Sequence, residues 1–299
     1  IKFAQVSGGG DFSCGVDTGN NPYCWGDNFS GQLGGSVGTD RLIPGLVTGG
    51  QHFSSVGAGA DYACGLDATG KAWCWGSNFL GQLGDGTNTD HTGPALVSGG
   101  QAFASLSVGA YHACGLTASG AAYCWGANTD GEIGDGTTIA RTTETAVAGT
   151  FVSLAAGTNF TCAVNSSGTM MCWGSNQSGQ LGNSSTTNHP SPAAVSGSVV
   201  FSKAAAGESH ACGVSTVGAA YCWGANANGQ IGDGTTAQKL VPTAVTPGTL
   251  VFSQIEAGFS HTCAATSGGS AYCWGSNEAG QLGDGTTTQR PSAVAVALP

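Results

Sequence analysis

The spacing of the cysteines is the feature that most constrains this chain. Its twelve cysteines fall in six pairs whose members are always ten residues apart, and equivalent pairs follow at intervals of 48 to 51 residues. The pairs are Cys14 and Cys24, Cys64 and Cys74, Cys114 and Cys124, Cys162 and Cys172, Cys212 and Cys222, and Cys263 and Cys273. A fixed period of about fifty residues indicates a repeat architecture. The six repeats run over about 1–50, 51–100, 101–150, 151–199, 200–249 and 250–299.

Each repeat is predicted to form four short β-strands. In the second repeat these are FSSVGAG from Phe53, YACGL from Tyr62, AWCWG from Ala72 and PALV from Pro94, separated by Gly, Asn, Asp and Thr. No segment shows a helical period.

The second and third strands are predicted to form a tight hairpin. If Cys64 faces Cys74, then Asp67 faces Lys71 and residues 68–70 form a three-residue loop, which favours glycine at its third, left-handed position. That position holds Gly70, Gly120, Gly168, Gly218 and Gly269, and in the first repeat Asn20.

This register places the two cysteines of a repeat opposite each other, with Cα atoms about 4.5 Å apart, which a disulfide accepts. A zinc site would need ligand pairs with short spacing such as C-x2-C, and the sequence has none. We therefore expect six disulfides within repeats and no metal. Disulfides persist in oxidising surroundings, so we expect an extracellular, cell-surface or periplasmic location.

Side-chain alternation makes both faces of each sheet apolar. Tyr23 and Trp25 point to one face of the third strand and Cys24 to the other. A four-stranded sheet buried on both sides and repeated in tandem is typical of a propeller blade. The predicted fold is an all-β propeller of six four-stranded blades, forming one domain over residues 1–299.

The repeat resembles a known family. The pattern G-x-x-H-x-C, then Y-C-W-G-x-N-x-x-G-Q-L-G-D-G-T, then P-x-x-V, is similar to the repeat of the regulator of chromosome condensation family, which includes a plant UV-B photoreceptor and propeller-type β-lactamase inhibitor proteins. The paired cysteines resemble a secreted, bacterial-type branch. Those relatives usually have seven blades, so six repeats leave open a complete propeller or a piece of a longer chain. Because the chain begins at Ile1, we expect a processed or excised segment.

The composition argues against several functions. A formal charge of -10 with seven Lys plus Arg leaves no basic patch for nucleic acid, and no apolar run is long enough to insert into a membrane. The sequence has neither G-x-S-x-G nor H-E-x-x-H, and we expect no enzymatic activity and no cofactor. Asp130 with Glu132, and Glu208 and Glu256, are interpreted as solvated loop residues.

Positions shared by the repeats are interpreted as structural. The tryptophans are expected to pack, the Asn of W-G-x-N to bond the backbone of its loop, and the Asp of each G-D-G to form a turn and not a calcium site. His112, His210 and His261 share a position with Phe12, Tyr62 and Phe160, which indicates a half-buried aromatic position.

Function is therefore expected where the repeats differ. The residues before the His position vary, and the resemblance to the photoreceptor implies that they form one protein-binding face. We assign to this face Asp11, Asp61, Tyr111, Asn159, Glu208 and Phe259.

A second variable set lies after W-G-x-N. Phe29, Phe79 and Leu80 replace polar residues there, and they form either an exposed apolar patch or a packing layer under their own loops.

The preferred hypothesis is an extracellular propeller that binds another protein or copies of itself. A carbohydrate-binding module is the alternative, with Trp73 and Tyr111 stacking on a glycan, and a secreted hydrolase is the second alternative.

Overall fold

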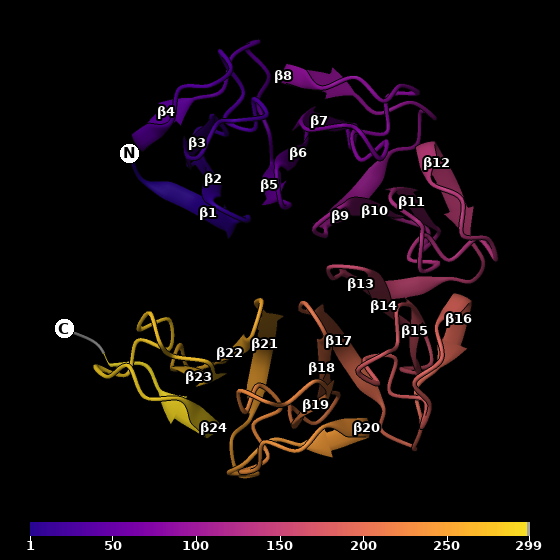
Figure 1. The fold of residues 1–299 in the computed structure, drawn as a ribbon, viewed down its shortest axis with the longest axis vertical. Helices are drawn as coiled ribbons and strands as arrows, with labels where there is room; N and C mark the ends of the chain where they lie inside the picture. The colour runs from indigo at the N-terminus through magenta and orange to yellow at the C-terminus, as the bar shows by residue number, and fades with distance from the viewer. Residues whose placement is uncertain (298–299) are drawn as a thin grey trace. The chain divides into compact units, whose positions relative to one another are not determined.

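The computed structural model describes residues 1–297. These residues form two compact units, which divide after Thr150, between the third and fourth repeats. Each unit contains three four-stranded antiparallel sheets, and the four strands of every sheet follow in chain order (Figure 1). Among the described residues, no helix is long and apolar enough to span a membrane.

Unit 1 contains blades 1 to 3. Its strands are β1 (Phe3–Gly8), β2 (Phe12–Asp17), β3 (Pro22–Gly26) and β4 (Arg41–Leu46) in blade 1; β5 (Ser55–Ala58), β6 (Tyr62–Leu66), β7 (Ala72–Gly76) and β8 (His91–Leu96) in blade 2; and β9 (Phe103–Val108), β10 (His112–Thr117), β11 (Ala122–Gly126) and β12 (Arg141–Val147) in blade 3.

Unit 2 contains blades 4 to 6. Its strands are β13 (Phe151–Ala156), β14 (Phe160–Asn165), β15 (Met170–Gly174) and β16 (His189–Ala194) in blade 4; β17 (Phe201–Ala206), β18 (His210–Ser215), β19 (Ala220–Gly224) and β20 (Lys239–Ala244) in blade 5; and β21 (Phe252–Ala257), β22 (His261–Thr266), β23 (Ala271–Gly275) and β24 (Arg290–Ala295) in blade 6.

These sheets are the blades of an all-β propeller, as predicted. The strand ends differ by a few residues from the expected ones: β5 begins at Ser55 and not Phe53, and β8 begins at His91 and not Pro94. The extra residues of β8 are paired because Gly76 lies opposite His91, beyond an irregularity in the ladder.

The central hairpin of each blade has the predicted register. Cys64 lies opposite Cys74, and the loop is closed by hydrogen bonds from Asp67 N to Lys71 O and from Gly70 N to Asp67 O, both 3.0 Å. Gly70 has φ 83° and Asn20 has φ 64°, the left-handed conformation that the loop requires.

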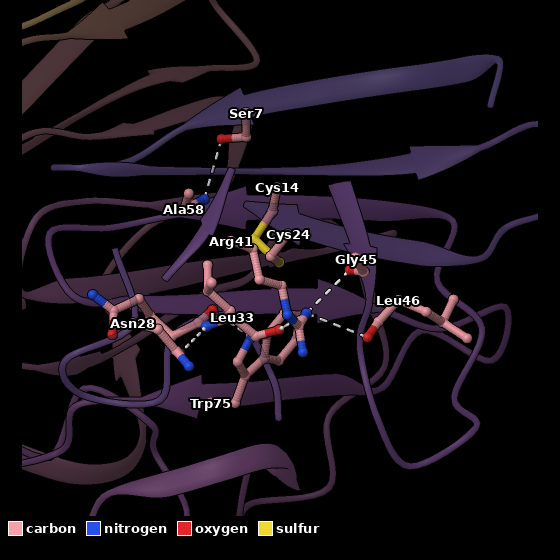
Figure 2. Close-up of a disulfide and its surroundings, with 11 residues drawn as sticks. Ser7, Cys14, Cys24, Asn28, Leu33, Arg41, Gly45, Leu46, Ala58 and Trp75 are labelled. Atoms are coloured by element: carbon pink, nitrogen blue, oxygen red, sulfur yellow. Dashed lines mark hydrogen bonds between the residues drawn. A yellow bond between two sulfur atoms is a disulfide. The ribbon is translucent and has the colours of Figure 1, made fainter. Parts of the chain in front are cut away.

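Six disulfides, one per blade, join the cysteines of each repeat. Their Cα atoms are 4.0 to 4.1 Å apart, and the described residues contain no free cysteine. The disulfides of blades 1 to 5 are buried in the core, whereas Cys263 of blade 6 is half-buried. Figure 2 shows the first disulfide, between Cys14 and Cys24.

Neighbouring blades pack through two different sides. The side of blade 2 that carries Cys64 and Cys74 contacts the side of blade 3 that carries Phe103 and Trp125, in one buried apolar cluster. We call these two sides of a blade its Cys flank and its Trp flank.

A buried hydrogen bond joins the two flanks at each of these junctions, and we call it the tryptophan clip. Trp75 Nε1 donates to Gln32 O over 2.9 Å, and Trp125 Nε1 donates to Gln82 O over 3.1 Å. The same bond occurs in unit 2 from Trp223 and Trp274, to the carbonyls of Gln180 and Gln230. Figure 2 shows Trp75 of blade 2 among residues of blade 1, and above it a bond from Ala58 N to Ser7 Oγ. The tryptophans of these four clips are therefore structural, as predicted.

Candidate functional site

The site predicted from the variable residues lies at one end of the blades. In each blade the turn between the first two strands is bonded to the loop that follows the third strand. Asp27 N donates to Asp11 O, Ser77 N to Asp61 O, and Ala127 N to Tyr111 O, over 2.9 to 3.0 Å. The two variable sets of the sequence therefore share one end of each blade.

In unit 1 the turns of neighbouring blades are also bonded to one another. Gly10 N donates to Gly59 O and Ala60 N donates to Ala110 O, both over 3.0 Å. These bonds hold three successive turns side by side, so Asp11, Asp61 and Tyr111 belong to one surface. The structure thus brings together the unit 1 members of the predicted face.

Three carboxylates lie close enough on this surface to interact. The pKa of the Asp61 carboxyl is raised, first by its partial burial and then by the negative charges of Asp27 and Asp11. Asp27 was missed by the sequence interpretation, although it is the only acidic residue at the x position of W-G-x-N in the six repeats.

Two phenylalanines extend from the same end. The side chain of Phe29 is 82% exposed and that of Phe79 is 60% exposed, whereas Leu80 is half-buried. The two phenylalanines are therefore exposed apolar residues and do not form a packing layer under their own loops. We call the surface formed by Asp11, Asp27, Asp61, Tyr111, Phe29 and Phe79 the acidic aromatic face.

Buried amides explain why these phenylalanines point outward. Asn78 Oδ1 accepts from Leu83 N over 2.9 Å and its Nδ2 donates to Thr89 O over 3.0 Å, while Gln82 Oε1 accepts from Leu80 N over 2.8 Å. The amides and the leucine occupy the interior of the loop, so the residue after Asn78 is left on the surface. The Asn of W-G-x-N therefore bonds its own loop, as predicted.

The corresponding end of unit 2 has a different chemistry. Thr158 N donates to Gly207 O over 3.1 Å, so its turns are also linked. Asn159 and Glu208 are half-buried, the pKa of Glu208 is raised by burial, and Phe259 is 68% exposed. None of the three predicted positions in this unit carries an aspartate.

The two aromatic residues of the carbohydrate hypothesis lie at opposite ends of their blades. Trp73 is near the hairpin end of β7, and its Nε1 donates to Asp67 Oδ2 over 3.0 Å. Tyr111 precedes β10 at the end where β11 finishes. These two side chains therefore do not form one stacking platform.

The G-D-G turns are closed by a polar side chain six residues after the aspartate. Asp233 forms an ion pair with Lys239 and Asp284 with Arg290, each at 2.7 Å, and Asp135 pairs with Arg141. In blade 2 the His91 Nε2 atom lies 2.7 Å from Asp85 Oδ2. Blade 1 has Gly35 in place of the aspartate, and Arg41 donates instead to the carbonyls of Leu33 and Gly45 (Figure 2). Among residues 1–297 no group of three or more His, Cys, Asp or Glu side chains could hold a metal ion.

Three predictions about polar residues were wrong in part. Glu256 is exposed as expected, but it lies in strand β21 and not in a loop. His112 and His210 are fully buried and not half-buried, and burial lowers their pKa values to about 4 and about 3. Glu132 is buried and not solvated, because it takes the place that Gln82 has in the loop of blade 2. Glu132 Oε2 accepts a hydrogen bond from Asp130 N over 2.8 Å, and Gln82 Oε1 accepts the equivalent bond from Leu80 N.

The comparisons with known proteins agree with the fold. The structure of human WBSCR16 is 20% identical with a TM-score of 0.90, covering 100% of this chain and 82% of that one. Yeast RCC1 (Prp20), in a structure bound to Kap60, is 20% identical with a TM-score of 0.86 over 99% of this chain and 75% of that one. The ectodomain of the Physcomitrella patens receptor kinase CR4 is 24% identical with a TM-score of 0.61 over 92% and 62%. A search of the curated proteins found no match.

These neighbours define the class as a β-propeller, and the repeat defines the family. The family model described as regulator of chromosome condensation (RCC1) repeat matches residues 3–32, 53–82, 103–132, 151–180, 201–230 and 252–281. A second model with the same description matches residues 69–116, 167–214, 218–265 and 268–298. The chain belongs to the RCC1 repeat family.

Proposed function

We propose that this protein is a binding module without catalytic activity of its own, and that its acidic aromatic face binds a basic segment of another protein. The observation that carries the proposal is the juxtaposition of three interacting carboxylates with two exposed phenylalanines. Carboxylates attract and orient a basic partner, and aromatic side chains supply apolar contact area at its centre.

The fold and the overall charge support this proposal. The formal charge of -10 would speed the approach of a basic partner at low salt. A propeller of the same fold, yeast Prp20, has protein partners. It was crystallised with Kap60 bound, and its binding to Gsp1p and histones was studied.

A peptide titration tests the proposal. A fluorescent peptide of alternating Lys and Leu, and a second of alternating Glu and Leu, would be titrated with the protein at 50 and 300 mM salt. The Lys peptide should bind more tightly, and its affinity should fall with salt. Replacing Asp11 and Asp61 with Asn should weaken binding about three- to tenfold, and replacing Phe29 and Phe79 with Ser should weaken it about tenfold.

The matched control is Glu278→Gln, which removes an exposed carboxylate far along the chain in unit 2. Its affinity for the Lys peptide should stay near that of the unmodified protein. Equal losses in the Asp and Glu variants would mean that the overall charge, and not this face, attracts the peptide.

We also propose that the protein functions outside the reducing cytosol, in an extracellular, cell-surface or periplasmic location. Six disulfides support this location, since such bonds persist in oxidising compartments. The intact mass of protein purified from its source without reductant should be twelve hydrogens lower than that of the reduced chain. Twelve free thiols in that sample would contradict the proposal.

A further inference from the structure

A pocket opens at the hairpin end of unit 1, between blades 2 and 3. Its volume is about 220 Å³, and it is bordered by the hairpin that leads into β7, by the connector from β8 to β9, and by β12 of the next blade. Its lining includes Lys71, Leu96, Gly99, Gly100 and Glu144, and we call it the junction pocket. The acidic aromatic face lies at the other end of β7, so the two sites are separate.

Two side chains of opposite charge line the junction pocket without pairing. Lys71 is exposed, and within the described residues its Nζ atom makes no ion pair and no hydrogen bond. Glu144 is half-buried, and partial burial raises the pKa of its carboxyl. Its Oε2 atom accepts one long hydrogen bond, from Gln101 N over 3.3 Å. The junction pocket therefore presents one cationic and one anionic group that can contact a ligand.

Both charges stand at positions where the other repeats are uncharged. The position of Lys71, three residues before the second cysteine, holds Asn21, Ala121, Thr169, Ala219 and Ser270 in the other blades. The position of Glu144 in the fourth strand holds Pro44, Pro94, Pro192, Pro242 and Ala293. Neither charge is needed to build a blade, which favours a role in binding.

The matching junction of blades 4 and 5 shows what the fold provides without these charges. Its pocket measures only about 110 Å³ and is lined by residues 167–170 and 195–201. None of these residues is charged. The larger pocket with two charged walls is therefore a particular feature of the junction of blades 2 and 3.

The glycines of the connector shape the junction pocket. A Cβ atom on Gly99 would collide with Glu144 Oε2, so this glycine leaves the space that the carboxylate occupies. A Cβ atom on Gly100 would have nothing within 4 Å, so this glycine borders open space. Within the described residues, the N–H groups of both glycines have no acceptor. They are therefore available to donate to an anionic group of a ligand.

The size and the charges of the junction pocket restrict the ligand. Sites for drug-sized ligands occupy about 300 to 1,000 Å³, so this pocket suits a smaller molecule. A ligand with a single charge would leave the other charged side chain of the pocket unpaired beside it, whereas a ligand with both charges pairs both. Leu96, which is 43% exposed, adds an apolar wall.

We propose that the junction pocket binds a small zwitterion, a compound that carries an ammonium and a carboxylate group on a short aliphatic chain, as free amino acids do. The ammonium pairs with Glu144, and the carboxylate pairs with Lys71 and accepts hydrogen bonds from the glycine amides. The aliphatic chain of the ligand packs on Leu96.

Titrations followed by NMR of the backbone amides test the proposal. The probes are glycine, 4-aminobutyrate and 6-aminohexanoate, whose two charges are progressively farther apart, with hexanoate and hexylammonium as singly charged controls. The amide signals of Gly99, Gly100 and Gln101 should move with the zwitterion that spans the pocket best. Its affinity should be about tenfold higher than that of either control.

Four variants assign the two ends of the ligand. Lys71→Gln should weaken binding of the best zwitterion about tenfold and leave hexylammonium binding unchanged. Glu144→Gln should weaken it as much and leave hexanoate binding unchanged, and it should fold because it keeps an oxygen that can accept from Gln101 N. Lys203→Gln and Glu278→Gln are the matched controls, because both residues are exposed in unit 2, and neither should change the affinity.

Glycine amides that do not move with any zwitterion, at concentrations up to tens of millimolar, would overturn the proposal. So would a singly charged control that binds as tightly as the zwitterions, because one charge would then suffice. Equal losses in the pocket variants and their matched controls would also overturn it, since the overall charge and not the pocket would then attract the ligand. The comparison of ligands needs no variant, so it decides even if a variant is unfolded.

Discussion

The tryptophan clip makes a prediction that two positions of the same chain can test. Trp125 is fully buried, and its Nε1 donates to the Gln82 carbonyl of the preceding blade. Its ring also packs on Gly84, where a Cβ atom would lie 2.6 Å from Trp125 Cδ1. Trp125→Phe removes the donor and part of this ring and leaves a buried carbonyl without its partner.

The magnitude follows from these two losses. An unsatisfied buried carbonyl costs about 1 to 3 kcal/mol, and the lost ring atoms cost about 1 kcal/mol more. We expect Trp125→Phe to lower the free energy of unfolding by about 2 to 4 kcal/mol. Trp25→Phe is the matched control: Trp25 is half-buried and donates to no acceptor in the described residues, so its loss should be about 1 kcal/mol or less.

Guanidinium unfolding followed by far-UV circular dichroism, with the disulfides intact, measures both variants. The midpoint should fall clearly for Trp125→Phe and little for Trp25→Phe. Because the clip joins two blades, Trp125→Phe should also reduce the cooperativity of the transition. Equal shifts of the two midpoints would refute the reasoning, since the clip would then contribute nothing beyond the ring.

Three further predictions concern individual positions. The buried His112 and His210 have pKa values of about 4 and about 3 in the folded protein. As the pH falls below about 6.5, these histidines become protonated in the unfolded chain but not in the folded one, which favours unfolding. The free energy of unfolding should therefore be highest above that pH and fall toward pH 4 by about 1.4 kcal/mol per pH unit for each histidine. His210→Phe should flatten this fall in urea midpoints, and an unchanged slope would show that His210 does not carry it. Asn78→Ala should cost about 2 to 4 kcal/mol and raise hydrogen exchange in its loop, whereas Asn88→Ala at an exposed position should cost less than about 0.5 kcal/mol. Gly120→Ala should lower stability by about 1 to 2 kcal/mol because its φ is 85°, with Ser119→Ala as a nearly neutral control in calorimetry; equal melting temperatures would contradict this account of the loop.

The parts of the fold that depend on neighbouring residues were predictable from sequence. The ten-residue cysteine spacing fixes the hairpin register, and Gly70 and Asn20 mark its left-handed position, because a three-residue loop allows few other arrangements. The blade and the six disulfides followed from this local geometry and the period, and the resemblance to the family was carried by the repeated motif.

Features that join different repeats were not predictable in the same way. In its tryptophan clip, Trp125 donates to a backbone carbonyl 43 residues earlier in the chain. Every residue type has a backbone carbonyl, so the sequence does not indicate which residue accepts this hydrogen bond. Glu132 was misread because its charge suggested solvent, whereas its position in the loop requires a buried acceptor for Asp130 N. Of the acidic aromatic face, Asp11, Asp61 and Tyr111 were named from sequence, but the proximity of Asp27 to Asp61 is visible only in three dimensions.

The disulfides have a consequence for how a protein of this kind can change in evolution. Each bond closes within its own repeat, and none ties one blade to another. Duplication or deletion of a fifty-residue gene segment would therefore add or remove a complete covalent set and leave no cysteine unmatched. The number of blades can vary in descendants of such a gene without any change in their oxidative folding.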